Sequence, residues 1–244
     1  MKRAGKGSRS SGVLIRAARK ALREAGNPVK APIMQAYMKS AIPYLGVHVP
    51  QVKKVAKTVF SRHRLDSFRE WRDTVLGLWN GARYREEKYL AIELAGYSAY
   101  REFRTLDALP MYEEMITSGA WWDYVDSIAS HRLGELLRLY PAEMRVVLRK
   151  WAKSENMWKR RSAILAQLGF KADTDLALLY DCIRPSIEEK EFFLRKAIGW
   201  ALRQFARVDA KEVMRYVAQH EAQLSPLSKR EALKALYLAG IVQR

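Results

Sequence analysis

The stretch from Gly119 to Pro141, GAWWDYVDSIASHRLGELLRLYP, decides the fold class, because it has the pattern of one long amphipathic helix between two breakers. At about 100° per residue, one narrow arc of this helix holds four side chains: Trp122, Asp126, Ala129 and Leu133. The stretch therefore predicts a helix over residues 121–139 that packs one face against a core.

Asp126 stands inside this largely apolar arc, one turn from the aromatic side chain of Trp122. A carboxylate in such a place is destabilising unless a cation or a hydrogen-bond donor meets it. One interpretation is a structural carboxylate that binds a neighbouring helix or loop. The other is a carboxylate that is held for chemistry on a cationic partner.

Helical patterns continue on both sides of this stretch, with short breaks that contain Gly, Asn or Pro. The other predicted helices cover residues 13–25, 31–41, 51–63, 67–79, 84–99, 106–118, 141–152, 155–168, 173–185, 188–207, 209–219 and 226–239. No stretch alternates convincingly with a period of two, so no sheet is predicted. Paired helices of about 12–20 residues indicate an all-α fold, an α-solenoid of divergent HEAT-like repeats. A globular helical bundle is the structural alternative.

The 244 residues suffice for one large domain or one repeat array. Residues 1–10 have the composition of a basic, disordered N-terminal arm. No boundary is visible within residues 11–244, which are therefore expected to form a single HEAT-like-repeat domain.

The charge balance favours a polyanionic partner. Lys and Arg total 44 against 26 Asp and Glu, a formal net charge of +18, and 49% of the residues are hydrophobic. Nucleic acid is the first candidate and an anionic membrane surface the second. No apolar run approaches the ~18 residues of a membrane span, and the basic N-terminus lacks the apolar region of a secretory signal. Cys182 is the single cysteine, which excludes an intrachain disulfide framework and fits the cytosol.

Neither a metal nor a cofactor is expected. The four histidines are scattered without ligand spacing: His48, His63, His131 and His220. The segment Gly5-Lys6-Gly7-Ser8 belongs to the N-terminal arm and is not a phosphate-binding loop. No nucleophile-elbow motif occurs.

A second informative helix ends at Arg207. On a helical wheel, four of its side chains fall within about 60° of one another: Lys196, Trp200, Arg203 and Arg207. Its apolar residues lie opposite, so Trp200 belongs to the cationic face. Such a face suits phosphate contact combined with stacking on a nucleoside. The alternative is a tryptophan that covers a helix joint among solvated cations.

A third helix places Arg161 in the apolar arc that Met157, Ile164 and Leu165 define. A guanidinium in such an arc needs a partner. The partner is either a buried carboxylate or a DNA phosphate that reaches the site.

Taken in chain order, these three helices resemble the AlkD family of bacterial HEAT-like-repeat DNA glycosylases. The resemblance covers nearly the whole chain, and its long near-literal strings make it specific. The matching segments are 37–39, 45–47, Pro50, 121–128, Trp158, Arg161, 163–165, 190–193, 196–200 and 226–232. His48 departs from a member of the family that carries Gln at this place, which leaves the lesion preference open but not the chemistry.

The resemblance implies excision of N3- and N7-alkylated purines, such as 3-methyladenine and 7-methylguanine or bulkier adducts, from duplex DNA at the start of base excision repair. It implies that Asp126 is the catalytic carboxylate and that Trp122 and Trp200 flank the backbone of the lesion nucleotide in a concave, basic cleft. The residues expected to bind DNA, from the family match or from the cationic face, are Tyr37, Arg161, Lys196, Arg203 and Arg207.

The residue chemistry agrees with that activity. A purine alkylated at N3 or N7 is already cationic, so it leaves as a neutral base without a general acid. Positive charge develops on the sugar, where a carboxylate stabilises it and tryptophan faces add cation–π attraction. An open solenoid suits an enzyme that grips the DNA backbone instead of flipping the base into a pocket.

Two other classes compete with the enzyme. A non-catalytic HEAT-repeat protein that binds DNA structures would use the same basic face, but Trp122, Asp126 and Trp200 favour catalysis. A protein-interaction scaffold fits the net charge of +18 poorly. The sequence thus predicts a cytoplasmic monomer that acts on DNA at the bacterial nucleoid and has no membrane partner.

Overall fold

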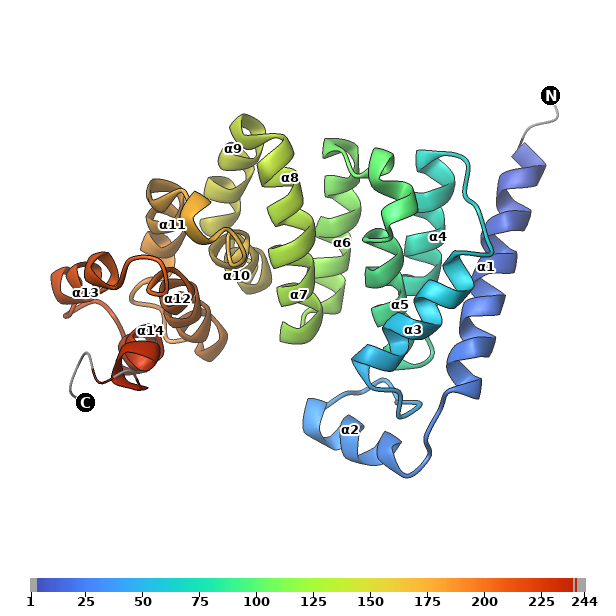
Figure 1. Cartoon of the computed structure of the whole chain (residues 1–244), viewed down its shortest axis with the longest axis horizontal. Helices are drawn as coiled ribbons and strands as arrows, with labels where there is room; N and C mark the ends of the chain where they lie inside the picture. Colours follow the sequence, from blue (N-terminus) through green and yellow to red (C-terminus); the bar gives the residue numbers. More distant parts are fainter. Residues whose placement is uncertain (1–3, 239, 241–244) are drawn as a thin grey trace. The chain divides into compact units, whose positions relative to one another are not determined.

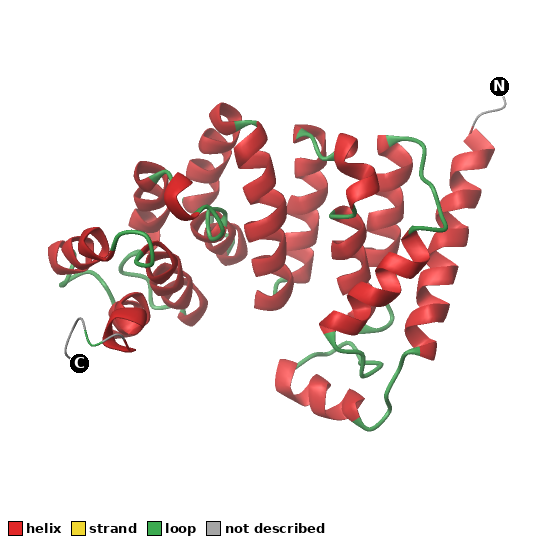
Figure 2. Cartoon of the chain, in the orientation of Figure 1, coloured by secondary structure: helices red, strands yellow, loops and turns green. Residues whose placement is uncertain are grey.

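The computed structural model describes residues 4–238 and residue 240, and all regular structure among them is helical (Figures 1 and 2). The predicted all-α fold is confirmed. Most helices pack against helices that are close to them in the chain, which is compatible with a HEAT-like helical array. No helix in the described part of the chain is long and apolar enough to cross a membrane.

The chain divides into two compact units, Met1–Met111 and Tyr112–Arg244. The sequence pattern did not indicate this division, and the single domain over residues 11–244 stays a prediction. The expected disordered arm over residues 1–10 differs from the structure, in which the first helix already begins at Ala4. Residues 1–3 of that arm lie outside the described residues.

Unit 1 contains five α-helices and two short 3₁₀ segments within its described residues. They are α1 (Ala4–Glu24), α2 (Lys30–Met38), α3 (Val49–Phe60), α4 (Phe68–Asn80), α5 (Arg85–Ala95), Ser98–Phe103 and Leu106–Ala108. The face of α1 that meets α3 and α4 carries Leu14, Ala18 and Leu22, which are all fully buried. Their spacing of four residues is the helical repeat that the sequence pattern had indicated.

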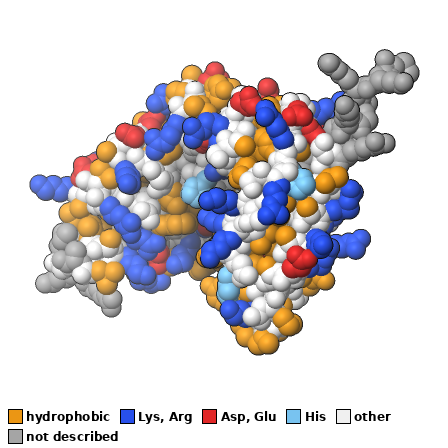
Figure 3. All heavy atoms as spheres, turned by 45° about the vertical axis from the view of Figure 1, so that its right-hand side comes forward, with side chains coloured by type: hydrophobic (Ala, Val, Ile, Leu, Met, Phe, Trp, Pro, Cys, Tyr) orange, Lys and Arg blue, Asp and Glu red, His pale blue; other side chains and the backbone are white. Residues whose placement is uncertain are grey.

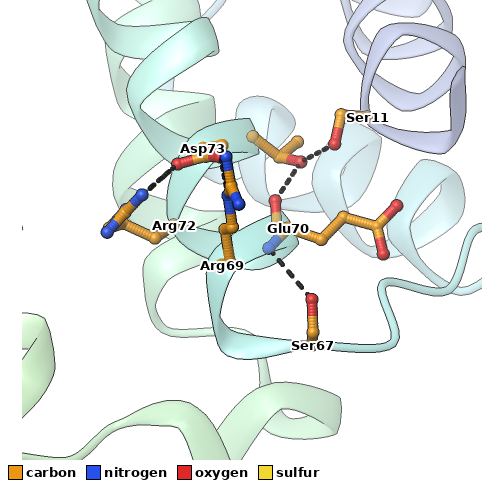
Figure 4. A network of polar contacts seen from close by, with 7 residues as sticks. Ser11, Ser67, Arg69, Glu70, Arg72 and Asp73 are labelled. Atoms are coloured by element: carbon orange, nitrogen blue, oxygen red, sulfur yellow. Dashed lines mark hydrogen bonds and ion pairs between the residues drawn. The ribbon is translucent and has the colours of Figure 1, made fainter. Parts of the chain in front are cut away.

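Side-chain hydrogen bonds fix several points of these elements. At the start of α4, Ser67 Oγ accepts a hydrogen bond from the Glu70 amide at 3.2 Å. Thr74 Oγ1 lies 2.6 Å from the Glu70 carbonyl oxygen and 2.8 Å from Ser11 Oγ, which joins α4 to α1 (Figure 4). The fully buried Glu86 carboxylate accepts the backbone amides of residues 45–47 at 2.8–3.0 Å and so holds the loop before α3.

Unit 2 begins within α6 (Leu109–Gly119). Its further described elements are α7 (Trp122–Ser127), a π-helical segment (Ile128–Leu133), α8 (Gly134–Leu139), α9 (Pro141–Ala152), α10 (Met157–Leu165), the 3₁₀ segment Lys171–Asp173, α11 (Leu176–Ile183), the 3₁₀ segment Arg184–Ser186, α12 (Phe192–Phe205), α13 (Ala210–Gln219) and α14 (Pro226–Leu238). The predicted helix 121–139 thus exists, but a wider turn interrupts its α geometry. The helix expected from residue 188 starts at Phe192, because Glu191 has extended backbone dihedral angles and forms the N-cap.

Candidate active site

Asp126 and Arg161 form a bidentate ion pair in unit 2. Arg161 Nε donates to Asp126 Oδ1 at 2.7 Å, and Arg161 Nη2 donates to Asp126 Oδ2 at 2.8 Å. The third nitrogen, Nη1, donates to the backbone carbonyl of Phe193. Arg161 is only 4% exposed. Of the two partners that the sequence left open for this guanidinium, the structure supplies the carboxylate.

These contacts join three helices at one point. Asp126 lies in α7, Arg161 in α10 and Phe193 in the first turn of α12. Because the fork geometry of a guanidinium matches that of a carboxylate, the pair fixes the plane in which the Asp126 oxygens lie.

Three aromatic rings pack beside the ion pair. The ring centroid of Phe193 lies 5.0 Å from that of Trp158 and 5.6 Å from that of Trp121. The Arg161 guanidinium carbon lies 5.8 Å from the Phe193 centroid, within the range of a cation–π contact. Residue-by-residue reasoning missed this cluster, although all three residues belong to the strings that carry the family resemblance.

Unusual backbone geometry frames Asp126 on both sides. Ala120 has a φ of 42°, in the left-handed region that a non-glycine residue seldom adopts, and Trp121 then caps α7 in an extended conformation. After Asp126 the chain enters the π-helical segment, a geometry often found at functional sites. Ser130 Oγ donates to the Asp126 carbonyl at 2.6 Å.

The first residue of α8 lies close to the residue that follows α10. A Cβ atom added at Gly134 would lie 2.7 Å from the Ala166 carbonyl oxygen, so no larger residue fits there without a shift. Gly134 directly follows the π-helical segment, and Ala166 follows the last residue of α10. The absence of a side chain at Gly134 therefore helps to keep Arg161 within reach of Asp126.

Burial and pairing act on the Asp126 carboxyl in opposite directions. Burial raises its pKa, the two hydrogen bonds and the charge of Arg161 lower it, and the net pKa lies above the usual value for an aspartate. The Asp126 side chain is still 13% exposed, whereas that of Arg161 is 5% exposed. A ligand can therefore approach the carboxylate from the side that Arg161 does not cover.

The tryptophans separate into two groups. Trp71, Trp79, Trp151 and Trp158 are buried core residues. Trp121, Trp122 and Trp200 remain partly exposed, the first two at the start of α7 and Trp200 within α12. A partly exposed Trp has an indole face that can contact a ligand.

The predicted cationic face of α12 is organised by an acidic residue that sequence reasoning did not single out. Lys196 Nζ and Arg203 Nη1 both donate to Glu231, a largely buried residue of α14. Arg207 lies beyond the end of α12, is exposed, and lines a cavity of about 180 Å³ with residues of α10 and α11. The structure thus groups Lys196 and Arg203 at Glu231 and places Arg207 at this cavity instead.

Tyr37 belongs to α2 in unit 1 and is 77% exposed. Lys and Arg side chains are frequent on the face drawn in Figure 3, in keeping with the net charge of +18. In the described part of the chain, no cluster of His, Cys, Asp and Glu could hold a metal ion.

Comparison with known proteins identifies the family. A sequence profile of the family described as DNA alkylation repair enzyme matches residues 18–236. A solved structure of a predicted DNA alkylation repair enzyme from Enterococcus faecalis is similar, with a TM-score of 0.78 and 29% sequence identity, covering 86% of this chain and 96% of that chain. No curated protein matches significantly. Because the profile covers most of the sequence, this chain belongs to the DNA alkylation repair enzyme family.

Proposed function

We propose that this protein is a DNA glycosylase of the AlkD type, which hydrolyses the N-glycosidic bond of cationic N3- and N7-alkylated purines in duplex DNA. The observation that carries the proposal is the Asp126 carboxylate, which Arg161 holds at 2.7 and 2.8 Å while it stays accessible on one side. Such excision would begin base excision repair. The family already implies that DNA is the partner.

The carboxylate would act on charge that develops during the reaction. A cationic purine leaves as a neutral base, and positive charge then grows on the deoxyribose. An ionised Asp126 in a fixed orientation stabilises that charge without the reorganisation that solvent would need. A carboxylate has about four lone-pair sites, so the two bonds from Arg161 leave acceptor capacity for a water nucleophile.

Arg161 takes a different role from the predicted one. Sequence reasoning expected it to contact DNA, but it is 4% exposed and donates to Asp126 and to the Phe193 carbonyl. We therefore assign Arg161 to positioning Asp126 and to keeping the buried carboxylate ionised. A phosphate contact is assigned instead to the more exposed Lys196 and Arg203.

Trp122 and Trp200 would line the path of the lesion nucleotide. Their partial exposure distinguishes them from the buried tryptophans of the core. Indole faces next to a cationic sugar add attraction through their quadrupole. Arg207 and Tyr37 are proposed as further DNA contacts. The protein is proposed to act as a monomer at the nucleoid, without a metal or cofactor.

The test is an assay for abasic sites in methylated duplex DNA, with wild type beside Asp126→Asn. Wild type should release 7-methylguanine and 3-methyladenine above the spontaneous background, and the variant should lose most of that excess. A folded Asp126→Asn protein that excises at the wild-type rate contradicts the catalytic assignment.

A second candidate function is that of a non-catalytic HEAT-repeat protein that binds DNA structures. The observation in its favour is that Asp126 is already paired with an internal cation, as a purely structural carboxylate would be. A non-catalytic DNA-binding protein would bind DNA tightly, and the wild type would excise no cationic purine. The same assay therefore separates the two candidate functions.

A further inference from the structure

Glu231 connects two cations that lie two turns apart on α12. Glu231 Oε1 accepts from Lys196 Nζ at 2.9 Å, and Glu231 Oε2 accepts from Arg203 Nη1 at 2.8 Å. The side chain of Glu231 is 11% exposed, whereas those of Lys196 and Arg203 are 38% and 20% exposed. The carboxylate is therefore largely covered, and the two cations keep surface that another anion can reach.

The backbone around Glu231 is arranged for this contact. A Cβ atom at Gly199 would lie 2.5 Å from Glu231 Cβ and 2.8 Å from the Ser228 carbonyl oxygen. Ser228 Oγ also donates to the carbonyl of Arg195 at 3.1 Å. Helices α12 and α14 thus approach each other closely at Gly199, the residue directly before Trp200, and this approach sets the depth at which Glu231 lies.

Lys196, Arg203 and Glu231 together carry one positive charge in excess. Burial alone would raise the pKa of Glu231, but its contacts with Lys196 and the charges of Arg203 and Lys234 outweigh burial, so the net pKa is lowered and the carboxylate is ionised at neutral pH. Lys196 and Arg203 each use one N–H donor on Glu231. An ammonium has three donors and a guanidinium five, so donors remain for an oxyanion.

Building on the proposed glycosylase function, we propose that Glu231 is a positioning residue that presents Lys196 and Arg203 together to one DNA phosphate next to Trp200. It holds two long side chains whose rotamers would otherwise vary. It also offsets one of their two charges, which limits binding to undamaged DNA. Glu231 therefore lowers the affinity for undamaged DNA, and it fixes the positions of the two cations at the DNA backbone beside the lesion.

The test compares Glu231→Gln with Glu212→Gln as a matched control. Glu212 lies on α13 and accepts hydrogen bonds from Tyr180 and Arg215. Glu212→Gln therefore also removes one paired negative charge, but on a different helix from Trp200. Two quantities are measured for each variant: the salt dependence of binding to undamaged duplex, and the single-turnover excision rate at saturating methylated DNA.

Glu231→Gln should bind undamaged DNA more tightly than wild type, with a log–log salt slope steeper by up to about 0.9. Its excision rate should fall by roughly tenfold to a hundredfold, since a misplacement of about 1 Å can slow the chemistry by about 10²-fold. Glu212→Gln should match wild type in both measurements. A Glu231→Gln protein that behaves like Glu212→Gln overturns the proposal.

Two further cases are covered, so that each result supports or contradicts the role of Glu231. If Glu231→Gln melts below the assay temperature, Glu231→Asp replaces it, because Asp keeps the charge but is one methylene too short to reach both cations. Slower excision with a wild-type salt slope then supports the proposal, and wild-type excision contradicts it. If wild type itself excises nothing, the proposed function fails, whereas the change in salt slope still tests the role of Glu231.

Discussion

At the scale of single residues, the ion pair changes what Asp126→Asn should do to stability. From the sequence alone, the removal of a buried negative charge looks neutral or favourable. The structure shows Arg161 bound to both carboxylate oxygens, so an Asn would turn one amide N–H donor toward a guanidinium donor. Breaking a buried pair from one side costs about 3–5 kcal/mol. Because the site is partly exposed, we expect the lower end of that range, measured by denaturant unfolding.

A double variant separates this stability effect from the chemistry. Asp126→Asn combined with Arg161→Met removes both charges and leaves no unpaired guanidinium. We expect it to regain most of the stability that Asp126→Asn loses, because an apolar replacement of a buried pair is often neutral. Excision should stay at background in both proteins. Recovery of excision together with stability would mean that Asp126 serves only the fold.

The raised pKa of Asp126 predicts a pH profile with a definite sign. Excision requires the ionised form, so the rate should fall as pH drops through a value above the usual aspartate pKa. The folded protein binds this proton more tightly than the unfolded chain, so Asp126 contributes more stability below the folded pKa and less as pH rises through it. The pKa of Glu231 is shifted the other way, below the usual glutamate value, because Lys196 and Arg203 pair with it. Rates corrected for spontaneous depurination should therefore fall at acid pH in wild type and stay flat, near zero, in Asp126→Asn.

At the scale of helices, the close approach of the start of α8 to the end of α10 can be tested with one methyl group. In Gly134→Ala the new Cβ would lie 2.7 Å from the Ala166 carbonyl oxygen, so the backbone at one of these two residues must shift. Overpacking of this kind costs typically 1–3 kcal/mol. We expect a lower Tm and slower excision at a temperature where the variant is folded, because α10 carries Arg161.

Gly169→Ala is the matched control for that variant. A Cβ atom at Gly169 meets nothing within 4 Å, so the same methyl group enters open space. This protein should keep the wild-type Tm and excision rate. Equal losses in the two alanine variants would show that packing between α8 and α10 does not set the geometry of the ion pair.

The elements also show what a sequence can and cannot predict. Apolar periodicity predicted the helices, and it marked Asp126 and Arg161 as a carboxylate and a guanidinium that each lie in an apolar arc. It did not join them, because they lie on different helices and periodicity carries no information about tertiary neighbours. Glu231 escaped notice for a related reason: an acidic residue in a polar helix looks solvated until α14 is packed on α12.

At the scale of the whole molecule, the net charge of +18 predicts steep salt dependence of DNA binding. Each neutralised phosphate contributes roughly 0.9 to the negative slope of log K against log salt. Affinity for undamaged duplex should fall at least about tenfold from low to moderate salt. A flat response would remove DNA as the partner of the cationic surface and favour the scaffold interpretation.

The distribution of that charge can be tested with single lysines. Lys196→Met should reduce the salt slope by up to about 0.9, because its ammonium is expected to meet a phosphate. The reduction should be smaller than for a free cation, since Glu231 already offsets part of the charge and stays paired with Arg203. Lys20→Met on α1 is the matched control: the Lys20 side chain is 77% exposed and pairs only loosely with Glu24, at 3.8 Å. If Lys20→Met reduces the slope as much as Lys196→Met does, binding follows total charge alone, and α12 is not a specific phosphate-binding face.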